Sequence, residues 1–413
     1  MRVWAFPSIY PFDRPGSKHT GIFAHRQYKA LIKCGAEVSV IVPINWYPPF
    51  PIYRLHTAWR KSARLDYPTK RVYEGVTVYH PRIANIKPSR FEKRPYTERY
   101  INSIIGFFKK NKIVLDPNKD IFFSQWIPDG GLAQMAAKKL GIKSCLLSIG
   151  DDVVVYPYQN ESNKDFFIKA TLAADGNYTV ADYLGRETNK IVGRQLHYDV
   201  IHMGADYRTF KPGTPEEVRE IKKQYNIPAD KVIILNIASS IVRKGWLDLF
   251  DALQEIKKTN NNFSLAAVYG TPYDLNLAEE AAKRGLTEHF LNLGSIAPEK
   301  LNAIYKAADI FCLPSHWEGI SVANMEAMSS GLSVITTNVC GHPELIKDGE
   351  TGILIPPKRV EMLTEKLATL INDSSLRTTL GRNARDFMIN EWGSYFDNAK
   401  LLYAKLSALL TDK

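Results

Sequence analysis

The sequence of 413 residues has few cysteines and no long apolar run. Its four cysteines are far apart and lack the spacing of metal ligands, which argues against a zinc site or a disulfide framework. No apolar run approaches the roughly 20 residues that span a bilayer. The first residues, MRVWAF, lead into proline and charged residues rather than into the apolar core of a signal peptide. These absences together favour a cytoplasmic protein with reduced cysteines.

Positive charge is present but unevenly distributed. The net charge is +11, and the first 120 residues contain 22 Lys and Arg against 8 Asp and Glu. A basic surface can attract phosphates, anionic lipid or nucleic acid, and charge alone does not choose among them. A nucleic-acid-binding protein is therefore one alternative, although no recognised binding motif accompanies the charge.

Short β-rich apolar runs alternate with helical periodicity along most of the chain, which is the pattern of parallel sheets covered by helices. In the first half we expect a helix at 22–34, capped by Gly35. The segments 44–75 and 84–100 are rich in proline, aromatic residues and arginine, and we expect long loops or short helices there. The expected strands are 2–6, 38–42, 76–80, 121–124, 144–149, 178–181 and 200–203.

A second series of strands begins near residue 231, after a linker-like segment, FKPGTPEE. We therefore predict an α/β protein with two Rossmann-like, doubly wound domains, at 1–205 and 206–388, facing a cleft. Residues 389–413 are expected to form a helix that packs back on the first domain. Because ligands bind at the carboxyl ends of strands in open α/β sheets, polar motifs there are candidates for chemistry. The second set of expected strands is 232–237, 264–269, 290–293, 310–314, 334–337 and 352–355.

The stretch EGISVANME begins and ends with a carboxylate, Glu318 and Glu326. A strand at 310–314 and a helix from about Ser321 would put Glu318 on the loop and Glu326 more than one turn into the helix. At about 100° per residue these positions cannot form a carboxylate pair on one helix face. They suit instead two groups that hydrogen-bond successive parts of one extended ligand.

Between the two acids, the backbone N–H groups of Gly319, Ile320 and Ser321 suit a phosphate, because a helix N-terminus offers unpaired donors and a positive dipole end. The alternative is that Ser321 only caps the helix and that both glutamates are solvated acids at its start. Spacing alone does not separate the two interpretations.

The segment ADIFCLPSHWEGISVANMEAMSSGLSVITTNVCGHPELIKDGETGILIPP, residues 308–357, resembles the signature region of the retaining glycosyltransferases of family 4, which have the GT-B fold and an E-x7-E motif. VIHMGADYRTFKP resembles the family's interdomain segment, RKG at 243–245 its phosphate-binding turn, and TGIFAHRQYKALIKCGAEVSVIVP its first loop and helix. The resemblance is strong in 230–375 and weak in 44–120. It implies a nucleoside diphosphate sugar, of UDP or GDP type, as the donor. It also implies that the N-terminal domain, 1–205, binds the acceptor and that the second domain, 206–388, binds the nucleotide sugar.

The resemblance also implies roles for single residues. The first glutamate of the family motif, here Glu318, holds hydroxyls of the donor sugar, and the second, Glu326, holds the ribose. A carboxylate can accept two hydrogen bonds from vicinal hydroxyls. Lys244 matches the lysine that neutralises the diphosphate leaving group, where negative charge builds up. The family's usual arginine, five residues earlier, is replaced by Ser239, so Arg243 is the candidate second cation, unless it is only a solvated surface residue.

Four further positions follow from the resemblance. Gly21 lies in the loop that approaches the donor phosphates, unless it only permits a tight turn. Ile149 stands where many relatives carry a histidine or arginine close to the reacting sugar. Asp152 is a candidate for contact with acceptor or donor, with capping of a helix as the alternative. Backbone groups near Ile296 are expected to contact the base.

We expect no catalytic metal. No D-x-D motif stands out at a strand end, and no His/Asp cluster has the spacing of metal ligands. Enzymes of this fold handle the diphosphate with basic groups and helix dipoles. Isolated histidines are more often structural than catalytic, and among His19, His25 and His316 only the last is kept as a candidate near the cleft.

The segment 89–112 mixes Lys and Arg with aromatic and aliphatic residues. A helix there would have a basic and an apolar side, which suits peripheral contact with an anionic membrane. The alternative is that the apolar side is ordinary core and that the basic residues are solvated.

The sequence therefore predicts a retaining hexosyltransferase that acts on a glycan or lipid-linked acceptor in cell-surface polysaccharide or glycolipid synthesis. In the implied same-face mechanism, Lys244 and the backbone N–H groups stabilise the departing diphosphate, whose oxygen deprotonates the incoming hydroxyl. The nearest alternative is a sugar-nucleotide epimerase or hydrolase on the same fold, which would consume donor without an acceptor.

Overall fold

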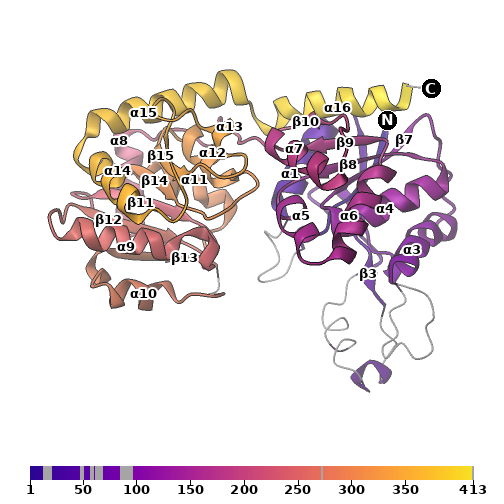
Figure 1. Ribbon diagram of the computed structural model, residues 1–413, viewed down its shortest axis with the longest axis horizontal. Helices are drawn as coiled ribbons and strands as arrows, with labels where there is room; N and C mark the ends of the chain where they lie inside the picture. The colour runs from indigo at the N-terminus through magenta and orange to yellow at the C-terminus, as the bar shows by residue number, and fades with distance from the viewer. Residues whose placement is uncertain are drawn as a thin grey trace. The chain divides into compact units, whose positions relative to one another are not determined.

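The computed structural model describes residues 1–12, 21–46, 51–55, 60, 68–83, 96–270 and 273–411 (Figure 1). The chain divides into two compact units. Unit 1 comprises Met1–Val180, Leu184–Ile201 and Ala399–Lys413, and unit 2 comprises Ala181–Tyr183 and His202–Asn398.

Unit 1 is built on a mainly parallel sheet with the strand order β10-β9-β8-β7-β1-β2-β5-β4. Strand β1 lies in the middle, with Val3 opposite Val38 of β2 and Ile121 of β7. The strands are β1 (Arg2–Phe6), β2 (Glu37–Ile41), β4 (Lys70–Tyr73), β5 (Val76–Tyr79), β7 (Asp120–Gln125), β8 (Lys143–Ser148), β9 (Gly176–Thr179) and β10 (Asp199–Val200), and β3 (Ile44–Asn45) pairs separately with β6 (Arg82–Ile83).

The expectation of loops or short helices throughout 44–75 is wrong for β3 and β4. Strand β4 pairs antiparallel with β5 through a two-residue turn, Glu74 and Gly75, both with positive φ. That backbone geometry is the one that favours tight hairpins, and Gly75 supplies half of it without strain. The surrounding prolines and basic residues concealed this short hairpin in the sequence.

Helix α3 (Tyr96–Lys110) carries the amphipathic segment of unit 1. Its apolar side is core: Tyr100, Ile104 and Phe108 are buried, and Phe108 meets Trp4 edge to face at a centroid distance of 4.9 Å. The core alternative therefore holds for the described part of 89–112, and residues 89–95 lie outside the described residues. The other helices of this part of the chain are α1 (Ile22–Lys33), α4 (Ile127–Leu140), α5 (Asp151–Val154), α6 (Glu161–Ala173), α7 (Asp182–Val192) and α16 (Tyr395–Thr411).

His80, which follows β5, is held neutral by its surroundings. Nδ1 lies 3.0 Å from the carbonyl oxygen of Val42, and Arg71 Nε donates to Nε2 at 3.1 Å. A second proton, on Nε2, would point at the Arg71 N–H group in a buried site, so the charged form of the ring is disfavoured. Burial, assisted by the charges of Arg71 and Arg82, lowers the pKa of His80 to about 4.

This shift predicts a loss of stability in acid. The unfolded chain, with an ordinary histidine pKa of about 6.5, takes up the proton first as the pH falls, so His80 should destabilise unit 1 progressively between pH 6.5 and about 4, by up to about 3 kcal/mol. Urea unfolding of the protein and of His80→Gln should therefore give free energies that converge as the pH falls. Asp and Glu side chains contribute equally to the pH dependence of both proteins. If the two plots of unfolding free energy against pH are parallel, His80 does not have the lowered pKa. His197→Gln, at a side chain that is 87% exposed, is the control.

Unit 2 is built on a fully parallel sheet with the order β13-β12-β11-β14-β15-β16. The predicted strands of this unit are confirmed within one residue at each end. They are β11 (Val232–Ile237), β12 (Phe263–Val268), β13 (Phe290–Gly294), β14 (Ile310–Leu313), β15 (Ser333–Thr337) and β16 (Ile353–Ile355). The helices are α8 (Pro215–Gln224), α9 (Trp246–Lys257), α10 (Leu277–Lys283), α11 (Pro298–Lys306), α12 (Val322–Ser329), α13 (His342–Leu345), α14 (Val360–Asn372) and α15 (Ser374–Phe387).

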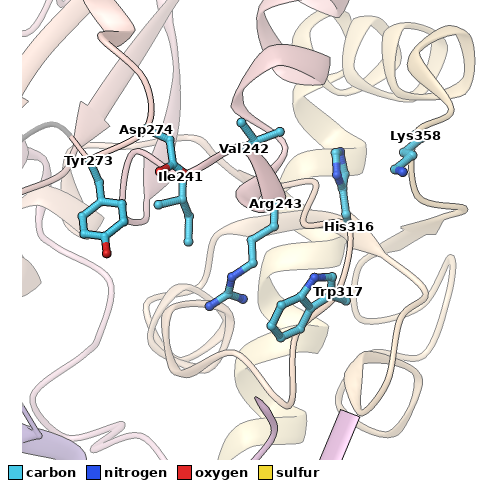
Figure 2. A pocket seen from close by; sticks show the side chains of 8 residues that line it. All are labelled: Ile241, Val242, Arg243, Tyr273, Asp274, His316, Trp317 and Lys358. Carbon is cyan, nitrogen blue, oxygen red and sulfur yellow. The ribbon is translucent and has the colours of Figure 1, made fainter. Parts of the chain in front are cut away.

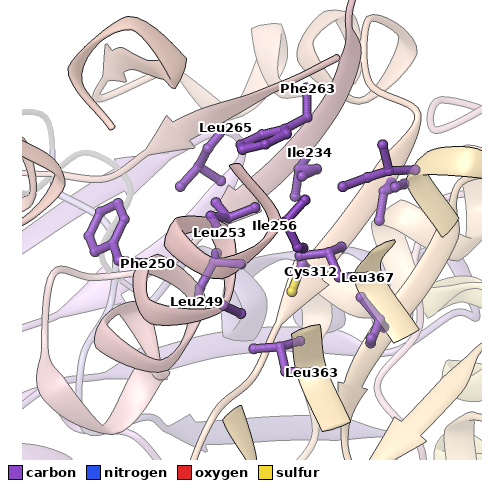
Figure 3. Packing of buried hydrophobic residues seen from close by; sticks show 14 of the residues in the cluster. Ile234, Leu249, Phe250, Leu253, Ile256, Phe263, Leu265, Cys312, Leu363 and Leu367 are labelled. Carbon is purple, nitrogen blue, oxygen red and sulfur yellow. The ribbon is translucent and has the colours of Figure 1, made fainter. Parts of the chain in front are cut away.

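One buried cluster joins α9 and α14 to a face of this sheet (Figure 3). Leu249 and Leu253 of α9 and Leu367 of α14 pack against Ile234 of β11 and Cys312 of β14. This packing fixes the neighbouring strands β11 and β14, whose carboxyl ends carry the candidate site.

None of the four cysteines, all of them in the described ranges, forms a disulfide bond. Within the described ranges, no helix is long and apolar enough to cross a membrane.

Candidate functional site

Two loops meet at the carboxyl edge of the sheet in unit 2. One follows β11 and includes a short 3-10 turn, η3 (Val242–Lys244), and the other connects β14 to α12. Gly245 allows the contact: its φ is +73°, and a Cβ there would lie 2.0 Å from the carbonyl oxygen of Pro314. The His316 N–H donates to the Arg243 carbonyl oxygen at 2.7 Å. The loops are therefore joined backbone to backbone.

Lys244 and Glu318 form an ion pair across these loops. The two side chains are 14% and 16% exposed, and the Ser315 hydroxyl lies 3.5 Å from the same carboxylate oxygen. The structure thus brings together two residues that are 74 positions apart in the sequence. A partly buried pair of this kind gives a fixed cation beside a fixed hydroxyl acceptor.

Helix α12 starts as the spacing of the motif predicts. The Ser321 hydroxyl caps it by accepting the Asn324 N–H at 3.3 Å. Gly319 and Ile320 are buried in the loop before it, and the Gly319 carbonyl oxygen accepts the Gly341 N–H at 3.0 Å. Capping by Ser321 is therefore real.

Glu326 lies within α12 and is only 5% exposed. The Tyr305 hydroxyl donates to Glu326 Oε2 at 3.1 Å and also lies 3.3 Å from the Ala323 carbonyl oxygen. The alternative in which both glutamates are solvated is wrong for Glu326. A carboxylate in the interior needs hydrogen-bonding partners, and Tyr305 of α11 supplies one of them.

A buried polar network behind α12 was missed from the sequence. His342 is fully buried, its Nδ1 lies 2.9 Å from the Thr337 carbonyl oxygen, and Asn324 Nδ2 lies 3.4 Å from its Nε2. Thr336 Oγ1 donates to the Leu313 carbonyl oxygen at 2.6 Å. Burial lowers the pKa of His342, although the nearby Glu318 charge opposes the shift. The neutral ring therefore ties the ends of β14 and β15 to the start of α12.

The Arg243 side chain packs on an aromatic ring. Its guanidinium carbon lies 4.0 Å from the centre of the Trp317 ring, so the two side chains stack. Ser239, at the position of the family arginine, contributes its carbonyl oxygen to the Trp246 indole N–H at 3.0 Å. Arg243 thus stacks on the residue that precedes Glu318 in the chain.

The other predicted positions lie on other elements of the two units. Ile296 is half-buried between β13 and α11. Gly21 precedes α1 with a φ of +73°, and a Cβ there would lie 2.5 Å from the Ile9 carbonyl oxygen, so a close backbone approach requires glycine. Thr20 and His19 lie outside the described residues. His25 is buried, with its Nδ1 2.6 Å from the Tyr10 hydroxyl, and is structural.

Asp152 has a structural position. It is fully buried, and its carboxylate accepts the N–H groups of Gly150 at 2.8 Å, Ile149 at 3.1 Å and Ile127 at 3.4 Å. Burial raises its pKa to about 6. This geometry favours a structural role over contact with acceptor or donor, because the carboxylate connects the turn before α5 to the start of α4.

In the part of the chain that the structure describes, no group of three or more His, Cys, Asp or Glu side chains could hold a metal ion.

The fold is similar to that of solved structures. The structure of sucrose-phosphate synthase from Thermosynechococcus elongatus matches with a TM-score of 0.75 at 18% identity, covering 99% of both chains. HepE of Anabaena in complex with UDP matches with a TM-score of 0.73 at 15% identity, covering 99% of this chain and 100% of that one. At these identities the similarity shows the fold, and the chain has the GT-B fold of such glycosyltransferases.

The sequence comparisons agree with this class. Residues 217–387 match the family model described as "Glycosyl transferases group 1". The putative teichuronic acid biosynthesis glycosyltransferase TuaC of Bacillus subtilis is 25% identical over 89% of this chain and 88% of its own length. The GDP-mannose-dependent alpha-(1-6)-phosphatidylinositol monomannoside mannosyltransferase of Mycobacterium tuberculosis is 25% identical over 52% of this chain and 57% of its own. Together these similarities support a GT-B glycosyltransferase.

Proposed function

We propose that the protein is a retaining glycosyltransferase of the E-x7-E type that transfers a hexosyl unit from a nucleoside diphosphate sugar to a hydroxyl of a glycan or lipid-linked acceptor. The observation that carries the proposal is the Lys244–Glu318 pair, which lies at the carboxyl ends of β11 and β14 with the buried Glu326 in the following helix. The cation suits the diphosphate of a sugar nucleotide, and the two carboxylates suit the hydroxyls of its sugar and of its ribose.

In this proposal each group takes one part of the donor. Glu326 accepts hydrogen bonds from the ribose hydroxyls while Tyr305 holds its other side. The backbone N–H groups of Gly319 and Ile320 approach the diphosphate together with Lys244. Glu318 accepts hydroxyls of the transferred sugar. Because Lys244 and Glu318 now neutralise each other, donor binding requires that they exchange this contact for the phosphate and for the sugar.

The reaction follows from where charge develops. As the glycosidic bond breaks, negative charge collects on the diphosphate, and Lys244 and the backbone donors stabilise it. The acceptor hydroxyl attacks from the same face and passes its proton to a phosphate oxygen, so the configuration of the sugar is retained. No side-chain nucleophile takes part, and no residue is assigned to hold a metal.

The choice of donor and acceptor is guided by the relatives. HepE is described in complex with UDP, and the mycobacterial mannosyltransferase is GDP-mannose-dependent, so both nucleotide classes are candidates. The names of the two relatives point to teichuronic acid and to phosphatidylinositol monomannoside, which supports a role in cell-surface polysaccharide or glycolipid synthesis. We do not propose membrane contact through α3, because its apolar side is buried in the core.

A thermal titration with UDP, GDP and ADP tests the donor site. One nucleotide at about 100 times its dissociation constant should stabilise the protein by about 2.7 kcal/mol. Glu326→Gln should lose most of this shift, because an amide offers one acceptor oxygen in place of two. Tyr305→Phe is the matched control: it keeps the carboxylate and removes only its support, so the shift should weaken but remain. Equal shifts in the protein and in Glu326→Gln would contradict the placement of the ribose.

The epimerase or hydrolase alternative makes a different prediction for turnover. Such an enzyme consumes the donor at full rate without an acceptor. A transferase should release nucleoside diphosphate quickly only when an acceptor is added. Measurement of nucleoside diphosphate release with and without acceptor separates the two.

A further inference from the structure

Three consecutive residues of the loop after β14 each contact a residue of η3 or of the first turn of α9. The three contacts are His316 with Asp248, Trp317 with Arg243, and Glu318 with Lys244. The first two lie beside an open pocket of about 470 Å³ in unit 2, and Figure 2 shows Arg243, His316 and Trp317 on its wall. Only the third contact is made by the proposed donor groups, so the first two need a separate explanation.

His316 is joined to both of these elements. Its Nε2 lies 3.0 Å from Asp248 Oδ2, and because a carboxylate can only accept hydrogen bonds, Nε2 carries the proton and donates. Both side chains are only 17% exposed, so water competes little for this hydrogen bond. The backbone N–H of His316 donates at 2.7 Å to the carbonyl oxygen of Arg243. One residue of the loop after β14 is thus joined to α9 through its ring and to η3 through its backbone.

The Arg243–Trp317 stack lies next to the ion pair in both loops. Arg243 precedes Lys244 in the chain, and Trp317 precedes Glu318. The guanidinium carbon is 4.0 Å from the centre of the Trp317 ring, which is within the range of a cation–π contact. This contact holds the chain neighbours of the donor groups together without using the donor groups themselves.

The three contacts differ in what the donor does to them. In the proposed function, the diphosphate takes Lys244 and the sugar takes Glu318, so their ion pair opens. The His316–Asp248 hydrogen bond and the Arg243–Trp317 stack include no group assigned to the donor, so donor binding leaves both in place. Groups that are already held in place lose little freedom when a ligand binds. The two persistent contacts therefore fix the spacing of the loops when the ion pair no longer does.

We propose that Asp248 and His316, together with the Arg243–Trp317 stack, are positioning residues. They keep η3 and the loop after β14 at a fixed spacing while the donor replaces the ion pair between the two loops. The inference rests on the proposed function and deepens it, because it names the contacts that hold the donor site in shape once the donor is bound. It also assigns the Arg243 side chain to the loop rather than to the donor diphosphate.

Isothermal titration calorimetry on the full chain tests the inference, with UDP, GDP, ADP and their glucose and mannose conjugates as probes. His316→Ala and Asp248→Ala each remove the hydrogen bond. Since His316 lines an open pocket, its truncation leaves no closed cavity in the core. Either variant should bind the hexose conjugate about tenfold more weakly than the parent protein, because the loop with Glu318 must then be ordered on binding. The loss should be smaller for the bare nucleotide, which does not engage the Glu318 carboxylate.

Conservative variants separate positioning from a role of the charges themselves. His316→Gln keeps an N–H donor close to the place of Nε2, and Asp248→Asn keeps an acceptor oxygen. Both should retain an affinity within about threefold of that of the parent protein. Asp251→Ala is the matched control. It removes another acid of α9 whose ion-pair partner, Arg284, lies outside these loops, so the affinity should not change.

The stack gives a separate test of Arg243. If Arg243 only positions the loop, Arg243→Ala and Trp317→Ala should weaken binding equally. The double variant should then be no weaker than either single variant, because all three lack the same contact. A guanidinium that paired with the diphosphate would instead make Arg243→Ala weaken the bare nucleotide far more than Trp317→Ala does, and this result would overturn the assignment of Arg243.

Calorimetry reports the affinity separately from the fraction of competent protein, so partial unfolding lowers the stoichiometry and leaves the affinity unchanged. Unchanged affinity in His316→Ala and Asp248→Ala would therefore overturn the inference, and the pair would be purely structural. Equal losses in the alanine and the conservative variants would also overturn it.

The parent protein keeps the two proposals apart. If it binds no hexose conjugate of any of the three nucleotides, the proposed function itself fails. If it binds one and the alanine variants bind it equally well, only the inference about the positioning residues fails.

Discussion

Replacement of Lys244 by alanine is expected to lower donor turnover by about 10²- to 10³-fold, the usual loss when one fixed group that stabilises a transition-state charge is removed. Lys244 is held at the carboxyl end of β11 by η3, and once donor binding has exchanged its ion pair with Glu318 for the diphosphate, the ammonium group already lies where charge develops. The Michaelis constant for donor should change less than turnover, since the charge to be stabilised grows as the bond breaks.

Turnover is measured as nucleoside diphosphate released with donor and acceptor both saturating. Glu318→Gln is the informative comparison. It also removes the ion pair, but it leaves Lys244 without a competing carboxylate, so UDP or GDP should bind it at least as tightly as the parent protein. If Lys244→Ala keeps its turnover while Glu318→Gln loses nucleotide binding, the lysine has no role at the diphosphate and the two residues form only a structural pair.

The sequence was most informative about unit 2, and the reason lies in its strands. The four inner strands of that parallel sheet, β11, β12, β14 and β15, are buried on both faces, so each reads as a short apolar run with turn residues beyond it. The N-cap of α12 at Ser321 could likewise be read locally. The pairing of Lys244 with Glu318 could not be read locally, because no local pattern connects positions so far apart. The expectation that both residues belong to one site came from the family resemblance.

What the sequence concealed depends on contacts between distant residues. The neutral His342 became identifiable only once β15, α12 and α13 were placed around it. Asp152 was ambiguous for the same reason: an acid before a helix can cap it or face a ligand, and only the three backbone donors around it decide. Arg243 adjoins Lys244 in the chain, yet its guanidinium stacks on Trp317, and the sequence does not show which way so long a side chain turns.

Replacement of Gly245 by alanine is expected to have the largest effect on stability in unit 2. The residue has a φ of +73°, and an added Cβ would lie 2.0 Å from the Pro314 carbonyl oxygen and 2.6 Å from its carbon, both backbone atoms. Backbone strain and overpacking each cost about 1–3 kcal/mol, so the free energy of unfolding should fall by about 3 kcal/mol or more. The collision would also separate the two loops, and the nucleotide-induced thermal shift should disappear.

Gly349→Ala separates the two causes. Gly349 lies in the same unit with a φ of +75°, but a Cβ there would meet nothing within 4 Å. Its replacement should therefore cost only the backbone term, about 1 kcal/mol, and leave the nucleotide shift intact. If urea unfolding gives equal losses for the two variants, contact between the loops contributes nothing beyond the left-handed backbone. If Gly245→Ala is the less stable variant yet keeps its nucleotide shift, the donor groups do not depend on the junction between β11 and β14.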